Sequence, residues 1–204
     1  MTTSFLATGR KCEMCKIKKL SCVLLCAAVC TGMCACGSSN KEKRQVNSVV
    51  TAMGNVAALP SAVTVFSTTD LEGNVVTNDF FAQADLTVVN FWGTFCNPCI
   101  DEMPELAEWA EEMPENVQML GVVVDAETAD SAEYDLAKQI IEKTGVKYTN
   151  VMGKGAFDQF LNNIVGVPTT VLIDKDGKVV GDAVVGAKVD EYKQQVEDYL
   201  NEQK

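Results

Sequence analysis

Two cysteines three positions apart, Cys96 and Cys99, are the residues of this sequence best placed to do chemistry. They stand in FWGTFCNPC, residues 91–99, at the end of an apolar run. Thiols at this spacing can form a structural disulfide, supply half of a metal site, or exchange with other disulfides as a redox dithiol. The chain has no histidine, which excludes Cys-His nucleophile pairs, histidine-bearing zinc sites and histidine-ligated haem.

The flanking sequence indicates how the two thiols are positioned. Residues 86–92, LTVVNFW, form a continuous apolar run typical of a central strand, and residues 98–112 have a helical period. Cys96 is therefore expected where a strand ends and a helix begins. Unpaired N–H groups and the helix dipole at that position favour its thiolate. Cys99 is one turn further on and can reach back, while Pro98 stiffens the turn.

The rest of the chain alternates short apolar runs with amphipathic stretches. A turn near Gly73 predicts a β-hairpin, Gly145 is expected to end a helix, and the KDGK segment predicts a second hairpin turn. The expected order is a hairpin over 63–66 and 71–77, the strand 86–92 and helix 98–112, a strand over 117–124, helices over 131–144 and 156–163, strands over 169–174 and 179–185, and a helix over 188–202. This order indicates an α/β fold.

The N-terminal residues differ from this domain in composition. A basic stretch precedes an apolar run over residues 20–35, which suits a secretory signal better than a membrane span of about 20 apolar residues. The next residues, CGSSN, resemble the lipobox of bacterial lipoproteins, whose cysteine becomes the lipidated first residue. We therefore expect a signal peptide over 1–36, lipidation at Cys36 and a flexible tether over 37–61. An uncleaved anchor is the alternative.

The charge balance bears on the partners of the domain. Of 17 basic and 28 acidic residues, five basic and one acidic precede residue 36, so the remainder holds 12 and 27 and carries a net charge of −15. Such a surface repels phosphate backbones. Nucleic acid is therefore not expected as a partner.

Two motifs together resemble the thioredoxin-like family. FWGTFCNPC matches its redox pair, and GVPTT at residues 166–170, leading into a strand, matches its cis-proline loop. The early hairpin, Glu102 three residues past the second cysteine and the signal with its tether resemble the TlpA/ResA branch of membrane-anchored thiol-disulfide oxidoreductases. This resemblance covers residues 62–204. It implies a thioredoxin-like fold in which a central mixed sheet is flanked by helices and an N-terminal β-hairpin is added.

The resemblance also assigns roles at the site. Cys96 is expected to be the exposed nucleophile that forms a mixed disulfide with the substrate, and Cys99 the resolving thiol. Val167 and Pro168 are expected to lie opposite the dithiol and to bind the substrate backbone, with a cis bond at the place where it costs least.

Three further residues near the cysteines are candidates. Asn90 stands where thioredoxin has a buried proton-moving aspartate, so Glu102, at i+3 from Cys99, is expected to take that role with a pKa raised by burial. The alternative is that Glu102 is an acid favoured near a helix N-terminus. Phe95, where the branch usually has tryptophan, is expected with Trp92 at the substrate site, although Trp92 also fits a core position.

We therefore expect an extracytoplasmic, lipid-anchored thiol-disulfide oxidoreductase without cofactor or metal, monomeric by default. The resemblance implies that it reduces protein disulfides, in cytochrome c maturation or a similar process, with electrons from a membrane carrier of the CcdA type. A disulfide-forming oxidase, a copper-handling protein and a thiol peroxidase are the alternatives. Peroxidases of this fold use a distant arginine, and only Arg44 follows the signal segment.

Overall fold

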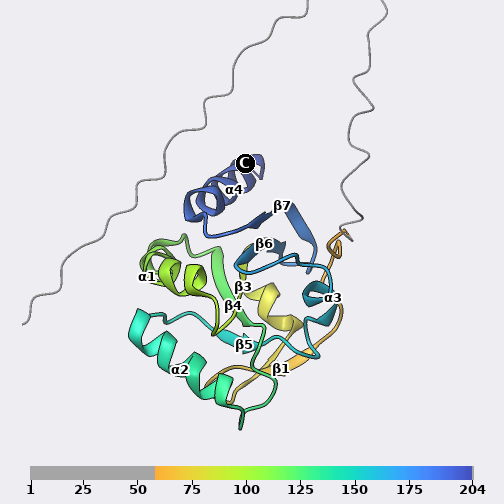
Figure 1. Cartoon of the computed structure of the whole chain (residues 1–204). Helices are drawn as coiled ribbons and strands as arrows, with labels where there is room; N and C mark the ends of the chain where they lie inside the picture. The colour runs from red at the N-terminus through yellow and green to blue at the C-terminus, as the bar shows by residue number, and fades with distance from the viewer. Residues whose placement is uncertain (1–57, 204) are drawn as a thin grey trace, which may run out of the picture. The chain divides into compact units, whose positions relative to one another are not determined.

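The computed structural model describes residues 58–203, and a five-stranded mixed sheet lies at their centre (Figure 1). The strand order is β5-β4-β3-β6-β7. Neighbouring strands are parallel from β3 through β4 to β5, whereas β6 is antiparallel to both β3 and β7. The bounds are β3 Leu86–Trp92, β4 Val117–Val123, β5 Asn150–Met152, β6 Thr169–Asp174 and β7 Val179–Val185. The predicted mixed sheet is thus confirmed.

Five helices flank this sheet. Those on one face are α1 (Asn97–Glu112), α2 (Ala132–Thr144) and α4 (Val189–Glu202), and those on the other are the 3₁₀ helix η1 (Asn78–Gln83) and α3 (Asp158–Leu161). Gly145, at φ 77°, ends α2 in the left-handed region as expected. The short helix predicted over 156–163 is reduced to the single turn of α3.

The central strand β3 explains how the two core layers form. All seven of its side chains are buried, and successive side chains point to opposite faces of the sheet. Val88 and Trp92 pack beneath the layer of α1, α2 and α4, whereas Val89 and Phe91 pack against η1 and α3. Asn90 shares the face of Val88 and Trp92, so this polar side chain points into the layer that contains α1.

The predicted N-terminal hairpin is present with one strand displaced. It consists of β1 (Ser67–Thr69) and β2 (Val75–Thr77), so the strand expected over 63–66 was placed too early. The carboxylate of Asp70 accepts hydrogen bonds from the N–H groups of Glu72 and Asn74, and this fixes the turn. The strands that pair are therefore those directly beside that turn.

Two elements were not predicted, η1 and β5. β5 has three residues, too few to show a strand period. η1 contains Phe80 and Phe81 in a run of six residues, which its composition alone leaves ambiguous between helix and strand.

The segment before the hairpin is attached to the opposite side of the sheet. Val63 donates its N–H to the carbonyl of Gly177, and Val179 donates to the carbonyl of Ser61. Ser61, expected at the end of the tether, is therefore already bound to the β6–β7 turn. Cys36 and the signal segment lie outside the described residues. Between residues 58 and 203, no helix has the length and apolar character needed to cross a bilayer.

Candidate active site

The two cysteines lie at the start of α1 and are joined by a disulfide. Cys96 is the N-cap residue of this helix, and its Sγ accepts a hydrogen bond from the N–H of Cys99 at 3.2 Å. Pro98, in the first turn, has no N–H to leave unpaired. In the reduced protein the same N–H and the positive end of the helix dipole would stabilise a thiolate at Cys96.

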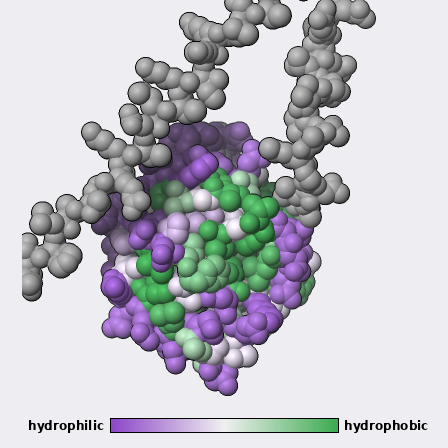
Figure 2. Space-filling view, in the orientation of Figure 1, coloured by the Kyte–Doolittle hydropathy of each residue, from purple (hydrophilic) through white to green (hydrophobic). Residues whose placement is uncertain are grey.

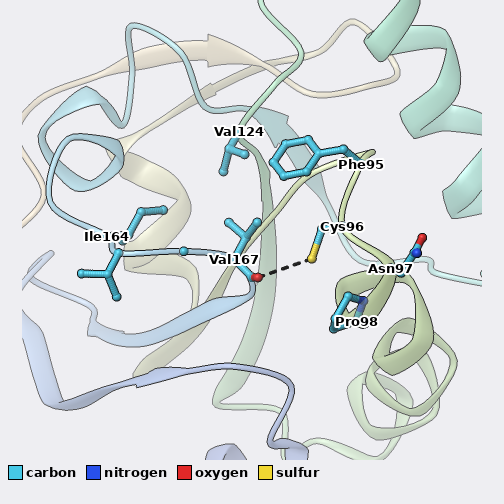
Figure 3. Close-up of a pocket in the computed structure, with 9 residues that line it drawn as sticks. Phe95, Cys96, Asn97, Pro98, Val124, Ile164 and Val167 are labelled. Atoms are coloured by element: carbon cyan, nitrogen blue, oxygen red, sulfur yellow. Dashed lines mark hydrogen bonds between the residues drawn. The ribbon is translucent and has the colours of Figure 1, made fainter.

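The nucleophilic cysteine is less accessible than expected. Cys96 is 5% exposed and Cys99 is 1% exposed, so the expected exposed nucleophile is in fact a buried residue in the disulfide form. The cause is the neighbouring loop, because Cys96 Sγ lies 3.5 Å from the carbonyl oxygen of Val167 (Figure 3). Cys96 nevertheless lines a groove that opens to solvent, and Cys99 does not.

This groove, which we call the disulfide groove, has a volume of about 530 Å³. It is lined by Phe95, Cys96, Asn97, Pro98, Val124, Ile164, Val165, Gly166 and Val167. The side chains of Phe95 and Val165 are 67% and 65% exposed at its border. Hydrophobic residues gather in the middle of the face shown in Figure 2, and hydrophilic residues surround them. Because most of the residues that line the disulfide groove are apolar, the groove can receive an apolar chain beside the reactive sulfur.

The Val167–Pro168 peptide bond is cis, as the GVPTT motif led us to expect. Only Val167 of this pair lines the disulfide groove. Pro168 is buried, and its carbonyl accepts a hydrogen bond from the N–H of Gly186 at 2.8 Å. In the dithiol state the Cys96 thiol can donate a hydrogen bond to the Val167 carbonyl. Because Cys96 Sγ is the atom that would form a mixed disulfide, the backbone of Val167 lies beside the place of that reaction.

Trp92 does not reach the groove. Its side chain is fully buried in the cluster that contains Cys96 and Cys99, and its indole N–H donates to Oδ1 of Asn150 at 2.9 Å. The expected contact between Trp92 and substrate is therefore wrong for this form of the protein. Trp92 is instead a core residue that packs in the same cluster as the disulfide.

Glu102 is a buried carboxylate of α1, three residues past Cys99. It is 6% exposed, and its Oε1 accepts a hydrogen bond from the side-chain amide of Asn90 at 3.0 Å. Its Oε2 lies 3.2 Å from the hydroxyl of Tyr192. Burial raises the pKa of Glu102 to about 7, although the bonds to Asn90 and Tyr192 oppose the shift. A carboxyl with this pKa can hold or release a proton near neutrality.

A second groove reaches Glu102 from solvent, and we call it the carboxylate groove. Its volume is about 610 Å³. It is lined by Pro98, Asp101, Glu102, Glu105, Ala187, Lys188, Val189, Asp190 and Glu191. Pro98 lines both grooves, so they lie on either side of the first turn of α1.

Two polar contacts at the site were not found from the sequence. Asp125 accepts hydrogen bonds from the N–H and hydroxyl of Thr94, the latter at 2.6 Å, and so holds the loop before Cys96. Tyr192 reaches Glu102 from α4. Its place on the apolar face of the last predicted helix was a usable signal, since a buried tyrosine hydroxyl normally has a polar partner.

Nowhere in residues 58–203 do three metal-ligating acidic or cysteine side chains come together. The two sulfurs are instead bonded to each other at the end of a strand, against a cis-proline loop. Fold and site together define a thiol-disulfide oxidoreductase of the thioredoxin-like class.

Comparisons with known proteins agree with this class. The family model described as Redoxin matches residues 35–200. Thiol-disulfide oxidoreductase ResA of Bacillus thuringiensis subsp. konkukian is 36% identical over 137 residues, which cover 66% of this chain and 72% of that protein. ResA of Geobacillus kaustophilus is 35% identical over 126 residues, 60% of this chain and 67% of that protein. The chain belongs to the redoxin family and is a TlpA/ResA-like thiol-disulfide oxidoreductase.

Solved structures show the same fold. The thioredoxin domain of a thiol-disulfide oxidoreductase from Bacteroides vulgatus has a TM-score of 0.56 and 26% identity, over 70% of this chain and 97% of that one. StoA from Bacillus subtilis has a TM-score of 0.54 and 17% identity, over 67% and 99% respectively. The thioredoxin-like fold expected from the two motifs is confirmed.

Proposed function

We propose that this protein reduces disulfides of exported proteins at the outer face of the cell membrane, where a lipid on Cys36 anchors it. The observation that carries the redox part is the Cys96–Cys99 disulfide at the start of α1, beside the Val167 carbonyl. The anchor and the location rest on the basic and apolar leader and on the CGSSN motif.

In the proposed cycle the reduced protein is the electron source. The Cys96 thiolate attacks one sulfur of a substrate disulfide, forms a mixed disulfide and releases the other substrate sulfur as a thiolate. Cys99 loses its proton and attacks Cys96 Sγ, which expels the second substrate sulfur and forms the Cys96–Cys99 bond. Two electrons pass to the substrate, and the two substrate thiolates that are released take up protons from water. A membrane dithiol carrier of the CcdA type then reduces the disulfide again.

Glu102 is proposed to take the proton of Cys99 in this cycle. Its pKa near 7 suits a group that must accept a proton and later release it, and the carboxylate groove gives it contact with water. Phe95 and Val167 are proposed to hold the apolar chain that flanks the substrate cysteine. The proposed substrates are thiol proteins of cytochrome c maturation or other exported thiol proteins.

The equilibrium potential of the Cys96/Cys99 couple tests the direction of transfer. It is measured by thiol trapping across redox buffers, on a soluble form that begins at Gly37. A potential near that of thioredoxin, about −270 mV, is expected of a reductase, whereas a potential near that of DsbA, about −120 mV, would make the protein an oxidase. The anchor is tested separately, because Cys36→Ser should move the protein from the membrane to the soluble fraction.

A further inference from the structure

The hydroxyl of Tyr192 stands between two hydrogen-bond acceptors. Tyr192, from α4, is 1% exposed. Its oxygen lies 2.6 Å from the carbonyl oxygen of Gly186 and 3.2 Å from Oε2 of Glu102, and it accepts a hydrogen bond from the N–H of Lys188 at 3.2 Å. A phenol has one proton to donate, so it can satisfy only one of these two acceptors at a time.

The charge of Glu102 decides which acceptor receives that proton. A protonated Glu102 can itself donate a hydrogen bond from Oε2 to the Tyr192 oxygen. The Tyr192 hydroxyl then donates its own hydrogen bond to the Gly186 carbonyl. An ionised Glu102 has Oε1 satisfied by Asn90, but its Oε2 needs a donor, and Tyr192 provides it. Burial raises the pKa of Tyr192 to about 12, so the phenol keeps its proton in both states.

Gly186 connects this choice to the cis-proline loop. Its N–H donates to the carbonyl of Pro168 at 2.8 Å, while its own carbonyl is the acceptor closest to Tyr192. Asn90 adds a second connection, since its amide donates both to Glu102 and to the hydroxyl of Thr170, two residues past the cis bond. One chain of hydrogen bonds therefore runs from Glu102 through Tyr192 and Gly186 to Pro168.

We propose that Tyr192 is a positioning residue that couples the protonation state of Glu102 to the cis-proline loop. Its hydroxyl donates a hydrogen bond to the Gly186 carbonyl while Glu102 is protonated, and to Glu102 once that carboxyl is ionised. Losing the proton of Glu102 then frees the Gly186 carbonyl, which is joined through the Gly186 Cα to the neighbouring peptide whose N–H holds Pro168. This requires Glu102 to titrate, as the proposed function does. It does not require Glu102 to take the proton of Cys99.

Several other charged or titratable groups face Glu102 and must be separated from it. Glu105 acts on it through its charge, and Tyr148, from the segment before β5, is in turn influenced by the charge of Glu102. The carboxylate groove adds Asp101 from α1 and, from the start of α4, Lys188, Asp190 and Glu191. The cysteines do not titrate while they are joined, so the oxidised protein is the form to study.

The experiment follows single atoms by NMR in the oxidised, full-length protein from about pH 5 to about pH 9. The amide nitrogen of Ala187 is bonded to the Gly186 carbonyl carbon, and its shift reports whether that carbonyl accepts a hydrogen bond. The side-chain carboxyl carbon of Glu102 is followed in parallel. In the wild type we expect both to change together, with an inflection near pH 7.

Two variants isolate the phenol. In Tyr192→Phe the Ala187 nitrogen should lose its inflection while the Glu102 carbon still titrates, and in Glu102→Gln the inflection should vanish altogether. The matched control is Tyr134→Phe, which removes another buried phenol, one that donates to the carbonyl of Leu71 at 2.8 Å. This control should retain the Ala187 inflection.

The outcomes separate this proposal from the proton relay. An Ala187 nitrogen that does not titrate in the wild type overturns the switch, whether or not Tyr192→Phe folds, and so does an inflection that persists in Tyr192→Phe. If Glu102→Gln exchanges disulfides at the wild-type rate while the wild-type Ala187 inflection is present, the relay fails and the switch stands.

Discussion

Two grooves meet at Pro98, and they are built from opposite kinds of side chain. The disulfide groove is lined largely by apolar residues, with no charged side chain among them, whereas the carboxylate groove is lined by five acidic residues and Lys188. One is suited to an apolar chain and the other to water. The cycle proposed above therefore assigns substrate docking and proton exchange to different sides of one helix turn. A bound substrate then leaves Glu102 in contact with solvent.

The sharpest separation is expected between the two cysteines themselves. Cys96→Ser should lower disulfide exchange by at least about a hundredfold, because it removes the nucleophile. Cys99→Ser should instead trap the substrate on Cys96, since no thiol remains to resolve the mixed disulfide. Non-reducing gels with a disulfide-bonded protein substrate distinguish the two. Trapping by Cys96→Ser but not by Cys99→Ser would reverse the assigned roles.

The carboxylate groove is tested next by Glu102→Gln. We expect the exchange rate at pH 8 to fall roughly tenfold to a hundredfold and the inflection near pH 7 in the rate profile to disappear, since an amide cannot take a proton. Glu105→Gln is the control, because Glu105 lines the same groove and is paired with Lys193 at the surface. Its inflection should persist and move to lower pH, because the charge of Glu105 helps to raise the pKa of Glu102. An unchanged pH profile in Glu102→Gln would assign the carboxylate groove no part in proton transfer.

The disulfide groove is tested by Phe95→Ser. The KM for a protein substrate should rise about five- to tenfold, because an exposed aromatic contact is lost, while the rate with a small aromatic disulfide changes little. Val75→Ser is the control, since Val75 is 70% exposed on the hairpin and lines neither groove. Equal losses with both substrates would place Phe95 in the chemistry rather than in docking.

The smallest expected effect concerns stability. The pKa of Glu102 rises from 4.5 to about 7 on folding, so between these values the folded protein keeps a proton that the unfolded chain has lost. The free energy of unfolding should therefore fall as the pH rises through this window.

Glu102→Gln should remove this slope. The variant should be more stable than the wild type at pH 8, on the order of 1 kcal/mol once water in the groove is allowed for, and about equal to it near pH 4. Urea unfolding of the oxidised proteins measures this, and the absence of histidine keeps the window free of imidazole. A parallel pH dependence in both proteins would contradict the raised pKa.

Local sequence was enough to predict the elements that carry the cysteines. β3 and the β6–β7 hairpin have the predicted bounds, because their apolar runs are bounded by turn residues. The CxxC and GVPTT motifs predicted the dithiol and the cis bond. A pattern that depends on residues close in sequence is visible without the fold.

Features that depend on distant contacts were not predicted. The burial of Cys96 depends on Val167, 71 residues further along, and the partner of Glu102 on α4 is 90 residues away. Trp92 is part of the core because Asn150, 58 residues later, accepts its N–H. None of these contacts is encoded in a local period, so the sequence alone could not decide between core and surface for Cys96 and Trp92.

The attachment of residues 61–63 to the β6–β7 turn has a mechanical consequence. The turn lies at one end of β6, and the cis-proline loop lies at the other end, roughly 17 Å away for a strand of this length. The chain thus enters the domain at the end of the sheet remote from the reactive sulfur. A force applied along the N-terminal segment would act on the β6–β7 hairpin, to which residues 61–63 are bonded. It would leave the disulfide free to face a large partner.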